Sequence, residues 1–190
     1  METTKIKDNP ILPSRAPAFS LRHRMLRLTW NFIWLLMASW TPKHFARWRR
    51  FLLRQFGAQM AERSDVRASA RVWYPPWLTM ERATVLAEGV ICYNMAPITI
   101  HENTIISQRA FLCAGTHDYT KGSHPLVTRP IEIGPHAWVA AEAFVGPGAV
   151  VAEGCVVGAR AVVNGRLEPW SVYAGNPAQR IKTRGYDAAT

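Results

Sequence analysis

Histidine is the side chain best suited to take a proton near neutral pH, so the histidines are the first candidates for chemistry in this chain. Two of them lie in a basic N-terminal segment and two fall at corner positions of a sequence repeat, where surface roles are expected. His117 lies where a regular strand pattern gives way to a polar loop, and loops on repetitive scaffolds often carry function. We therefore expect His117 to be a general base, with His124 as the second candidate. The six histidines are His23, His44, His101, His117, His124 and His136.

The three cysteines do not indicate a disulfide framework or a structural zinc site. Cys92, Cys113 and Cys155 are odd in number and show no CxxC spacing, and a reducing compartment fits this usage. Cys113 lies four residues before His117, which raises a nucleophilic cysteine as a rival mechanism. Its inward position beside the repeat favours structural packing instead.

A six-residue repeat must position these side chains. From residue 133 onward every sixth residue is aliphatic and β-branched, and small or turn-forming residues follow at fixed offsets. An α-helix needs apolar spacings of three and four, and a single strand needs two, so a period of six fits neither. It predicts a triangular coil in which each hexapeptide forms one short strand and one corner, with the aliphatic side chain inside. The repeating positions are Ile133, Val139, Val145, Val151, Val157 and Val163.

The same pattern starts upstream at Val66, with two-residue shifts from Leu78 to Met80 and from Ile98 to Ile100. We expect such shifts to widen a corner. Between residues 118 and 130 the register lapses in a polar stretch with one glycine and two prolines, which predicts a loop thrown out of the solenoid. The expected organisation is a flexible N-terminus (1–17), a basic aromatic-rich helical segment (18–58), the β-helix (59–168, with loop 118–130) and a C-terminal exit segment (169–190).

Residues 1–56 hold most of the positive charge, because eleven Lys or Arg against Glu2 and Asp8 leave +9 of the net +10. Residues 26–40 form a tryptophan-rich apolar run that is short of the roughly twenty residues needed to span a bilayer. Nucleic acid is not expected as a partner, because the aromatic residues are interleaved with aliphatic ones instead of standing along a polar groove. Two interpretations remain. Residues 18–56 contact an anionic membrane surface, which their composition favours, or they cap the open end of the solenoid.

Three stretches resemble the hexapeptide-repeat acyltransferases, the superfamily of galactoside, maltose, serine and xenobiotic acetyltransferases. Residues 114–118 (AGTHD) resemble the catalytic-histidine segment, residues 130–140 resemble the element that holds a tryptophan, and residues 175–178 (GNPA) resemble the exit motif, in the same order and spacing. Nearly the whole chain also resembles the branch of colanic acid biosynthesis acetyltransferases. That likeness rests on residues 52–58 (LLRQFGA), 93–94 (YN) and 107–119.

The resemblance implies an all-β solenoid, a left-handed parallel β-helix with an extruded loop and an N-terminal α-helical segment. It implies an O-acetyltransferase that moves acetyl from acetyl-CoA directly to a saccharide hydroxyl in exopolysaccharide biosynthesis, with no acyl-enzyme and no metal. It also implies a homotrimer whose sites lie between adjacent subunits. Because residues 1–17 show no secretory signal, we expect a cytoplasmic protein, peripheral at the inner face of the cytoplasmic membrane.

The resemblance also implies roles for single residues. His117 is the general base, and a main-chain N–H near Ala141 meets the oxyanion. Trp138 lines the acyl site or packs at a subunit contact, and both interpretations stay open. Asn94 corresponds approximately to an acceptor-binding residue of the sugar enzymes.

Coenzyme A is expected along small residues of the coil and near basic residues of the exit segment, which would meet its phosphates. Gln179 stands where relatives often carry a basic residue, so Arg180 is a further candidate for the 3′-phosphate. The expected cofactor contacts are Ala141, Ala159, Asn164, Lys182 and Arg184.

Two other functions remain open. A non-catalytic solenoid that serves as a scaffold or binding protein would suit the repeats, but it does not explain His117, Trp138 and the exit motif together. A metal-dependent hydratase of the carbonic anhydrase type shares this fold and needs three histidines on zinc, including a closely spaced pair. His117 and His124 are separated by six residues within the loop.

Overall fold

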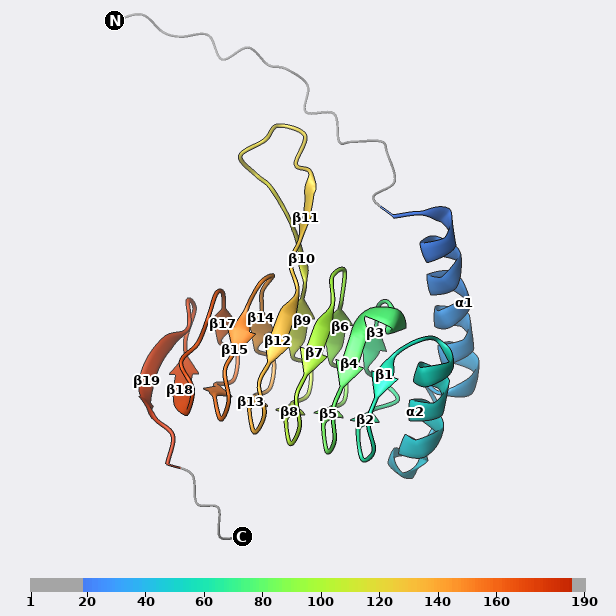
Figure 1. Cartoon of the computed structure of the whole chain (residues 1–190), viewed down its shortest axis with the longest axis horizontal. Helices are drawn as coiled ribbons and strands as arrows, with labels where there is room; N and C mark the ends of the chain where they lie inside the picture. The colour runs from blue at the N-terminus through green and yellow to red at the C-terminus, as the bar shows by residue number, and fades with distance from the viewer. Residues whose placement is uncertain (1–18, 186–190) are drawn as a thin grey trace, which may run out of the picture.

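The computed structural model describes residues 19–185, which form a three-sided coil of short strands with two helices at its N-terminal end (Figure 1). The expected N-terminal segment 1–17 lies outside the described residues. The coil strands stack in parallel on the strands of the previous turn, so that three sheets form, which we call faces A, B and C. The all-β solenoid with an extruded loop and an N-terminal helical segment, expected from the sequence, is confirmed.

Each face is a ladder of strands from successive coils. Face A holds β1 (Gln59–Met60), β4 (Leu78–Met80), β7 (Ile98–Ile100), β12 (Ile131–Ile133) and β15 (Val150–Val151). Face B holds β2 (Asp65–Val66), β5 (Val85–Leu86), β8 (Ile105–Ile106), β13 (Trp138–Val139), β16 (Val156–Val157), β18 (Ser171–Ala174) and β19 (Gln179–Thr183). Face C holds β3 (Arg71–Val72), β6 (Ile91–Tyr93), β9 (Phe111–Cys113), β14 (Phe144–Val145) and β17 (Val162–Val163).

The aliphatic residues of the repeat build the core, because each coil places one of them directly over the last. On face B, Val66, Leu86, Ile106, Val139 and Val157 are at most 1% exposed. Burying one such side chain contributes roughly 1.5–3 kcal/mol. Small residues close the corners. Ala110, Ala143, Ala149 and Ala161 are fully buried there.

The two-residue shifts widen one corner, as expected. Val66 pairs with Leu86, twenty residues on, whereas Val139 pairs with Val157, eighteen residues on. The extra residues lie between faces C and A, in the segments 73–77 and 94–97, the first of which contains the short helix η2 (Pro75–Trp77). At this same corner the third coil inserts the hairpin of β10 (Gly115–His117) and β11 (Leu126–Thr128), which stands out from the solenoid (Figure 1).

Two helices cover the N-terminal end of the coil. They are α1 (Leu21–Met37) and α2 (Ala46–Gln55), joined by η1 (Lys43–Phe45), and α2 packs on β1 and β2. Arg49 of α2 is fully buried; its Nε donates to the Val66 carbonyl at 2.6 Å and its Nη2 lies 3.1 Å from Asp65 Oδ1. The capping role considered for this segment is therefore present. Among residues 19–185, neither helix is long and apolar enough to cross a membrane.

The C-terminal segment stays on the solenoid for one more strand than the expected boundary at residue 168. β18 pairs in parallel with β16, through Val156 and Val172. A turn with a cis bond between Asn176 and Pro177 then reverses the chain. β19 returns antiparallel along β18, and all five of its residues are exposed.

Candidate active site

The β10–β11 hairpin carries His117 at the end of β10, paired with Leu126, and exposes its side chain to solvent. The ring atom Nδ1 lies 2.6 Å from the main-chain oxygen of His124. A carbonyl oxygen can only accept a hydrogen bond, so Nδ1 must carry the proton in this contact. The other ring nitrogen, Nε2, then keeps its lone pair in the neutral imidazole. His117 is thus held in the tautomer that a general base needs.

Asp118 orders the hairpin beyond His117. Its Oδ1 accepts hydrogen bonds from the main-chain N–H of Thr120 at 3.1 Å and from the Thr120 hydroxyl at 2.6 Å. These bonds, with the Thr120 hydroxyl first, hold the pKa of Asp118 below its ordinary value, and the charge of Lys121 acts in the same direction. The N–H of Asp118 donates to the Pro125 carbonyl at 3.0 Å. Asp118 therefore stabilises the loop that presents the His124 carbonyl.

The base of the hairpin rests on the coil below it. The N–H of Ala114 donates to the Tyr93 carbonyl at 3.1 Å, and a Cβ at Gly115 would lie 2.6 Å from Met95 Sδ. A side chain at this position would therefore require the Met95 side chain to move. In β9, Leu112 belongs to the interior cluster and Cys113 does not, although Cys113 is also buried. The inward position expected for Cys113 is thus occupied by Leu112.

Asn94 lies one coil below the hairpin and is fully buried. Its Nδ2 donates to the Tyr74 carbonyl at 2.7 Å and its Oδ1 accepts from the Tyr74 N–H at 3.0 Å. The carboxamide thus makes the two main-chain hydrogen bonds that a neighbouring strand would otherwise make with Tyr74, and it stabilises the widened corner. The contact between Asn94 and an acceptor that the resemblance implies stays a prediction.

Trp138 lies on face B, on the side of the coil opposite the corner that bears the hairpin. Its Nε1 donates to Ser107 Oγ at 2.8 Å, and its ring remains 46% exposed beside Ile105, which is 48% exposed. Ser107 fixes the indole orientation. Sequence reasoning missed this partner, because the two residues are 31 positions apart and the intervening hairpin hides their register.

The expected cofactor contacts fall on two different corners. Ala141 and Ala159 stand one coil apart between faces B and C, where the Arg160 N–H donates to the Ala141 carbonyl at 3.0 Å. Within residues 19–185 the N–H of Ala141 has no acceptor, so it is available to an oxyanion. Asn164 stands between faces C and A, directly over Gly146, and is exposed. One copy of the chain therefore does not bring His117 together with Trp138, Ala141 and Ala159.

A charge ladder that the sequence did not reveal borders the Ala141 corner. Glu142 Oε2 lies 2.6 Å from Arg160 Nε, and its other oxygen contacts Arg109. These two guanidinium groups, Arg160 first, hold the pKa of Glu142 below its ordinary value. Both arginines are exposed, so this corner presents cations beside small residues.

The two basic residues expected at the coenzyme phosphates differ in their surroundings. Lys182 of β19 is exposed and makes no hydrogen bond or ion pair through its side chain within the described part of the chain. Arg184 Nη1 donates to the carbonyls of His136 and Gly154, at 2.8 and 3.0 Å. Arg180, the further candidate, lies 3.3 Å from Glu168. Lys182 is the cation with the greatest freedom to meet a phosphate.

Two of the other histidines are held by the fold. His101 lies 3.2 Å from both Glu81 and Glu132, in a ladder on face A. His23 corrects an expectation, since the surface role predicted for it is wrong. It is 7% exposed and stacks between the rings of Phe19 and Tyr74, with centroids 4.5 and 3.9 Å away. Among residues 19–185 no group of three His, Cys, Asp or Glu residues is placed to hold a metal ion.

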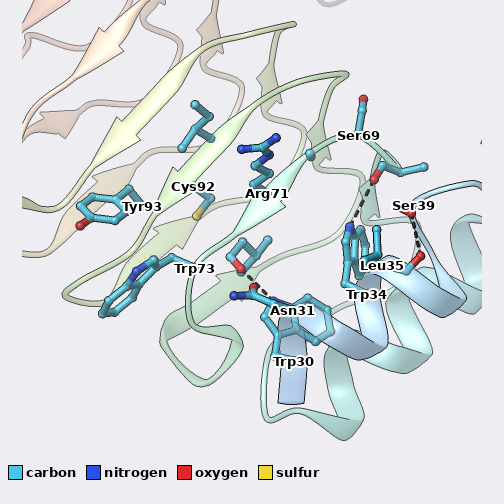
Figure 2. Close-up of a pocket in the computed structure, with 14 residues that line it drawn as sticks. Trp30, Asn31, Trp34, Leu35, Ser39, Ser69, Arg71, Trp73, Cys92 and Tyr93 are labelled. Atoms are coloured by element: carbon cyan, nitrogen blue, oxygen red, sulfur yellow. Dashed lines mark hydrogen bonds between the residues drawn. The ribbon is translucent and has the colours of Figure 1, made fainter. Parts of the chain in front are cut away.

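A cavity of about 670 Å³ lies between part of α1 and the first coils of face C (Figure 2). Trp34 and Trp73 line it, together with Asn31 and Arg71, whose side chains are exposed. Trp30 closes it from α1, where its Nε1 donates to the Val72 carbonyl at 2.8 Å. The cavity lies beside the N-terminal helices and not at the hairpin that carries His117.

Comparisons with known proteins bear on the family and the fold of the chain. No family model matches the chain. Over 155 residues it is 37% identical to WcaF of Escherichia coli (strain K12), assigned as an acetyltransferase of colanic acid biosynthesis, covering 82% of this chain and 85% of the relative. WcaF of Shigella flexneri matches equally.

Solved structures show the same fold. A hexapeptide-repeat acetyltransferase of Vibrio cholerae in complex with acetyl-CoA has a TM-score of 0.79 at 20% identity, over 90% of this chain and 93% of that one. A maltose O-acetyltransferase of Clostridium difficile has a TM-score of 0.73 at 19% identity, over 88% and 90%.

Proposed function

Because the chain belongs to the family of colanic acid biosynthesis acetyltransferases, we propose that this acetyl-CoA-dependent acetyltransferase acetylates a saccharide hydroxyl and that His117 is its general base. The contact between His117 Nδ1 and the His124 carbonyl, at 2.6 Å, is the observation that supports this most directly. It leaves Nε2 free to accept the proton of a hydroxyl group. A saccharide acceptor is supported by the names of a relative and a structural neighbour, which include colanic acid biosynthesis and maltose.

The reaction needs one proton acceptor and one oxyanion donor. His117 Nε2 takes the hydroxyl proton as the sugar oxygen attacks the thioester carbon. The N–H of Ala141 stabilises the tetrahedral oxyanion. The carbon–sulfur bond then breaks, and the CoA thiolate takes the proton back from the imidazolium. No residue of the chain becomes acylated, and no metal takes part.

We further propose that the active unit is a homotrimer with each site between two subunits. The hairpin of one copy would bring His117 to the corner of a neighbour that carries Ala141 and Ala159. Trp138 and Ile105, both nearly half exposed on face B, supply apolar area of the kind that a subunit contact covers. Coenzyme A would lie between the copies, along Ala141, Ala159 and Asn164, with Lys182 at its phosphates.

The proposed location is the cytoplasm, next to the inner face of the cytoplasmic membrane, where lipid-carried saccharides become available as acceptors. Residues 18–56 would provide the membrane contact.

A thiol-release assay tests the proposed activity. The chain is incubated with acetyl-CoA and, in turn, with free saccharides, nucleotide sugars and lipid-linked sugars, and free CoA is measured. We expect release that depends on one acceptor class and that His117→Ala lowers by a factor of about 10² to 10⁴. If no acceptor class leads to CoA release, and the folded protein binds no acetyl-CoA, the non-catalytic scaffold would be favoured.

A further inference from the structure

Helix α1 is apolar on two opposite faces. Its inner face packs on the solenoid through Trp30, which is 1% exposed, and through Trp34, whose Nε1 donates to the Ala68 carbonyl at 3.2 Å. Its outer face carries large apolar side chains that are each more than half exposed. At 100° per residue these point away from Trp30 and form one stripe along the helix. The stripe consists of Leu21, Met25, Leu28, Phe32, Leu35 and Leu36.

Such a stripe is unusual on a surface in contact with water alone. Monomeric proteins seldom leave contiguous apolar patches exposed, and those that remain often mark a binding surface. The solenoid does not require these side chains, because Trp30 and Trp34 already anchor the helix from the other side. The outer face of α1 is therefore free to bind a partner outside the described residues of this copy.

The charge around the stripe indicates the nature of this partner. Residues 19–61 contain eight Lys or Arg and no Asp or Glu. Five of the eight are exposed and form no ion pair within the described residues: Arg22, Arg24, Lys43, Arg47 and Arg54, the last of which donates to the Met60 carbonyl. On a helical projection Arg22 and Arg24 fall on either side of the stripe. The partner must therefore offer both an apolar region that can bury these side chains and negative charge beside it.

A second copy of α1 offers the first property but not the second. The stripe spacing of four, three, four and three residues would suit a two-stranded coiled coil. Parallel pairing would however bring Arg22 and Arg24 of both copies together, and antiparallel pairing would set them beside a helix end that carries no carboxylate. The surface of an anionic bilayer meets both requirements, and a helix of seventeen residues is suited to lie along it, since it is too short to span it.

We propose that the outer face of α1, flanked by Arg22 and Arg24, binds the surface of an anionic lipid bilayer. The apolar side chains enter the boundary between headgroups and acyl chains, and the arginines attract the acidic headgroups. The helix lies parallel to the bilayer surface, and the solenoid lies on the side of the helix that faces away from the bilayer. The benefit of membrane binding for the cell rests on the proposed function, because a lipid-carried saccharide acceptor would lie at the same membrane surface.

Flotation of the full chain with vesicles tests the proposal. We expect binding to vesicles of equal parts phosphatidylglycerol and phosphatidylcholine, and little to pure phosphatidylcholine. The triple variant Leu28→Gln, Phe32→Gln, Leu35→Gln should bind at least tenfold less. These side chains are 65%, 60% and 64% exposed, so the fold should persist. The matched control is Ile181→Gln, an equally exposed apolar residue (60%) on β19 at the far end of the solenoid, which should bind like the wild type.

Arg22→Gln with Arg24→Gln should remove the preference for anionic lipid, as should 1 M salt, where the Debye length falls to about 3 Å. Equal flotation of the wild type and the triple variant would overturn the proposal. Failure of the wild type to float with anionic vesicles would overturn it as well. A triple variant that changes only the number of subunits would assign the stripe to a second copy and would also overturn it. Acetyl transfer to a water-soluble acceptor is measured in parallel, so that failure of lipid binding is distinguished from failure of the enzymatic assignment.

Discussion

His117 Nδ1 and the main-chain oxygen of His124 face each other across the β10–β11 hairpin at 2.6 Å, which fixes the tautomer of the proposed base. Replacing His117 by Ala should lower kcat by a factor of about 10² to 10⁴, the usual contribution of a positioned general base. The coil should stay intact because the side chain is exposed. Initial rates of thiol release and the elution volume of the assembly are the measurements.

Two control variants distinguish the role of His117 from possible roles of the nearby residues His124 and Cys113. His124→Asn keeps the carbonyl and suits the positive φ of 44° at this position, so activity should remain near that of the wild type. Cys113→Ser should also remain active. A Cys113 variant as inactive as His117→Ala would point to an acyl-enzyme, and an inactive His124→Asn would make the His124 side chain itself part of the site.

Lys182 and Arg184 should respond differently to truncation. Lys182→Ala is expected to raise the KM for acetyl-CoA more than the KM for dephospho-acetyl-CoA, because a free cation near the 3′-phosphate contributes only when that group is present. Arg184→Ala should instead lower the free energy of unfolding, by about 1–3 kcal/mol, since it leaves the carbonyls of His136 and Gly154 without this donor. Equal KM ratios in the wild type and Lys182→Ala would move the phosphate site to another cation.

Asn94→Ala should destabilise the protein, because it removes both hydrogen bonds to the Tyr74 main chain from a fully buried place. The expected loss is about 1–3 kcal/mol in urea unfolding. Gln108→Ala, at an exposed corner, is the matched control and should cost little. A raised KM for the acceptor at temperatures where the variant is folded would support the sugar contact that the resemblance implies. Unchanged stability would remove the structural role.

His23 should make the attachment of α1 sensitive to pH. Burial, with the nearby charge of Arg27 as the second cause, lowers the pKa of His23 below its ordinary 6.5. As the pH falls, the unfolded chain therefore takes up this proton before the folded chain does. The His23 contribution to stability is complete above about pH 6.5 and decreases below it, until the folded-state pKa is reached.

Thermal unfolding between neutral and mildly acidic pH measures this effect. His23→Phe can occupy the same stack between Phe19 and Tyr74 without titrating, so its midpoint should fall less on acidification than that of the wild type. Identical pH dependence of the two proteins would contradict the assignment to His23.

The six-residue period predicted the solenoid because it is a strictly local rule. An aliphatic residue such as Val139 or Val157 must return to the inside after each corner, and the sequence states this directly. The widened corner at Leu78 and Ile98 was readable for the same reason. The hairpin was visible as a gap in the period.

Features that depend on register between coils could not be predicted. Asn94 meets Tyr74, and Trp138 meets Ser107, only because the coils stack with a definite offset. Arg49 looks like a surface residue of a basic helix, yet α2 turns it inward to the Val66 carbonyl. His23 was assigned to the surface because its stacking partners Phe19 and Tyr74 come from segments separated by more than fifty residues. Charge and local composition carry no information on such pairings.

A coil of stacked strands ends in open strand edges, and an open edge can accept further strands from another molecule. The last strand of face B in the regular coil direction is β18, and β19 occupies its edge in the antiparallel sense. With Arg180 and Lys182 among its exposed residues, β19 is itself a poor template for another chain. Helix α2 covers β1 and β2 at the opposite end. End-to-end fibre growth along the solenoid axis is therefore opposed by a helix on one side and by a charged, reversed strand on the other.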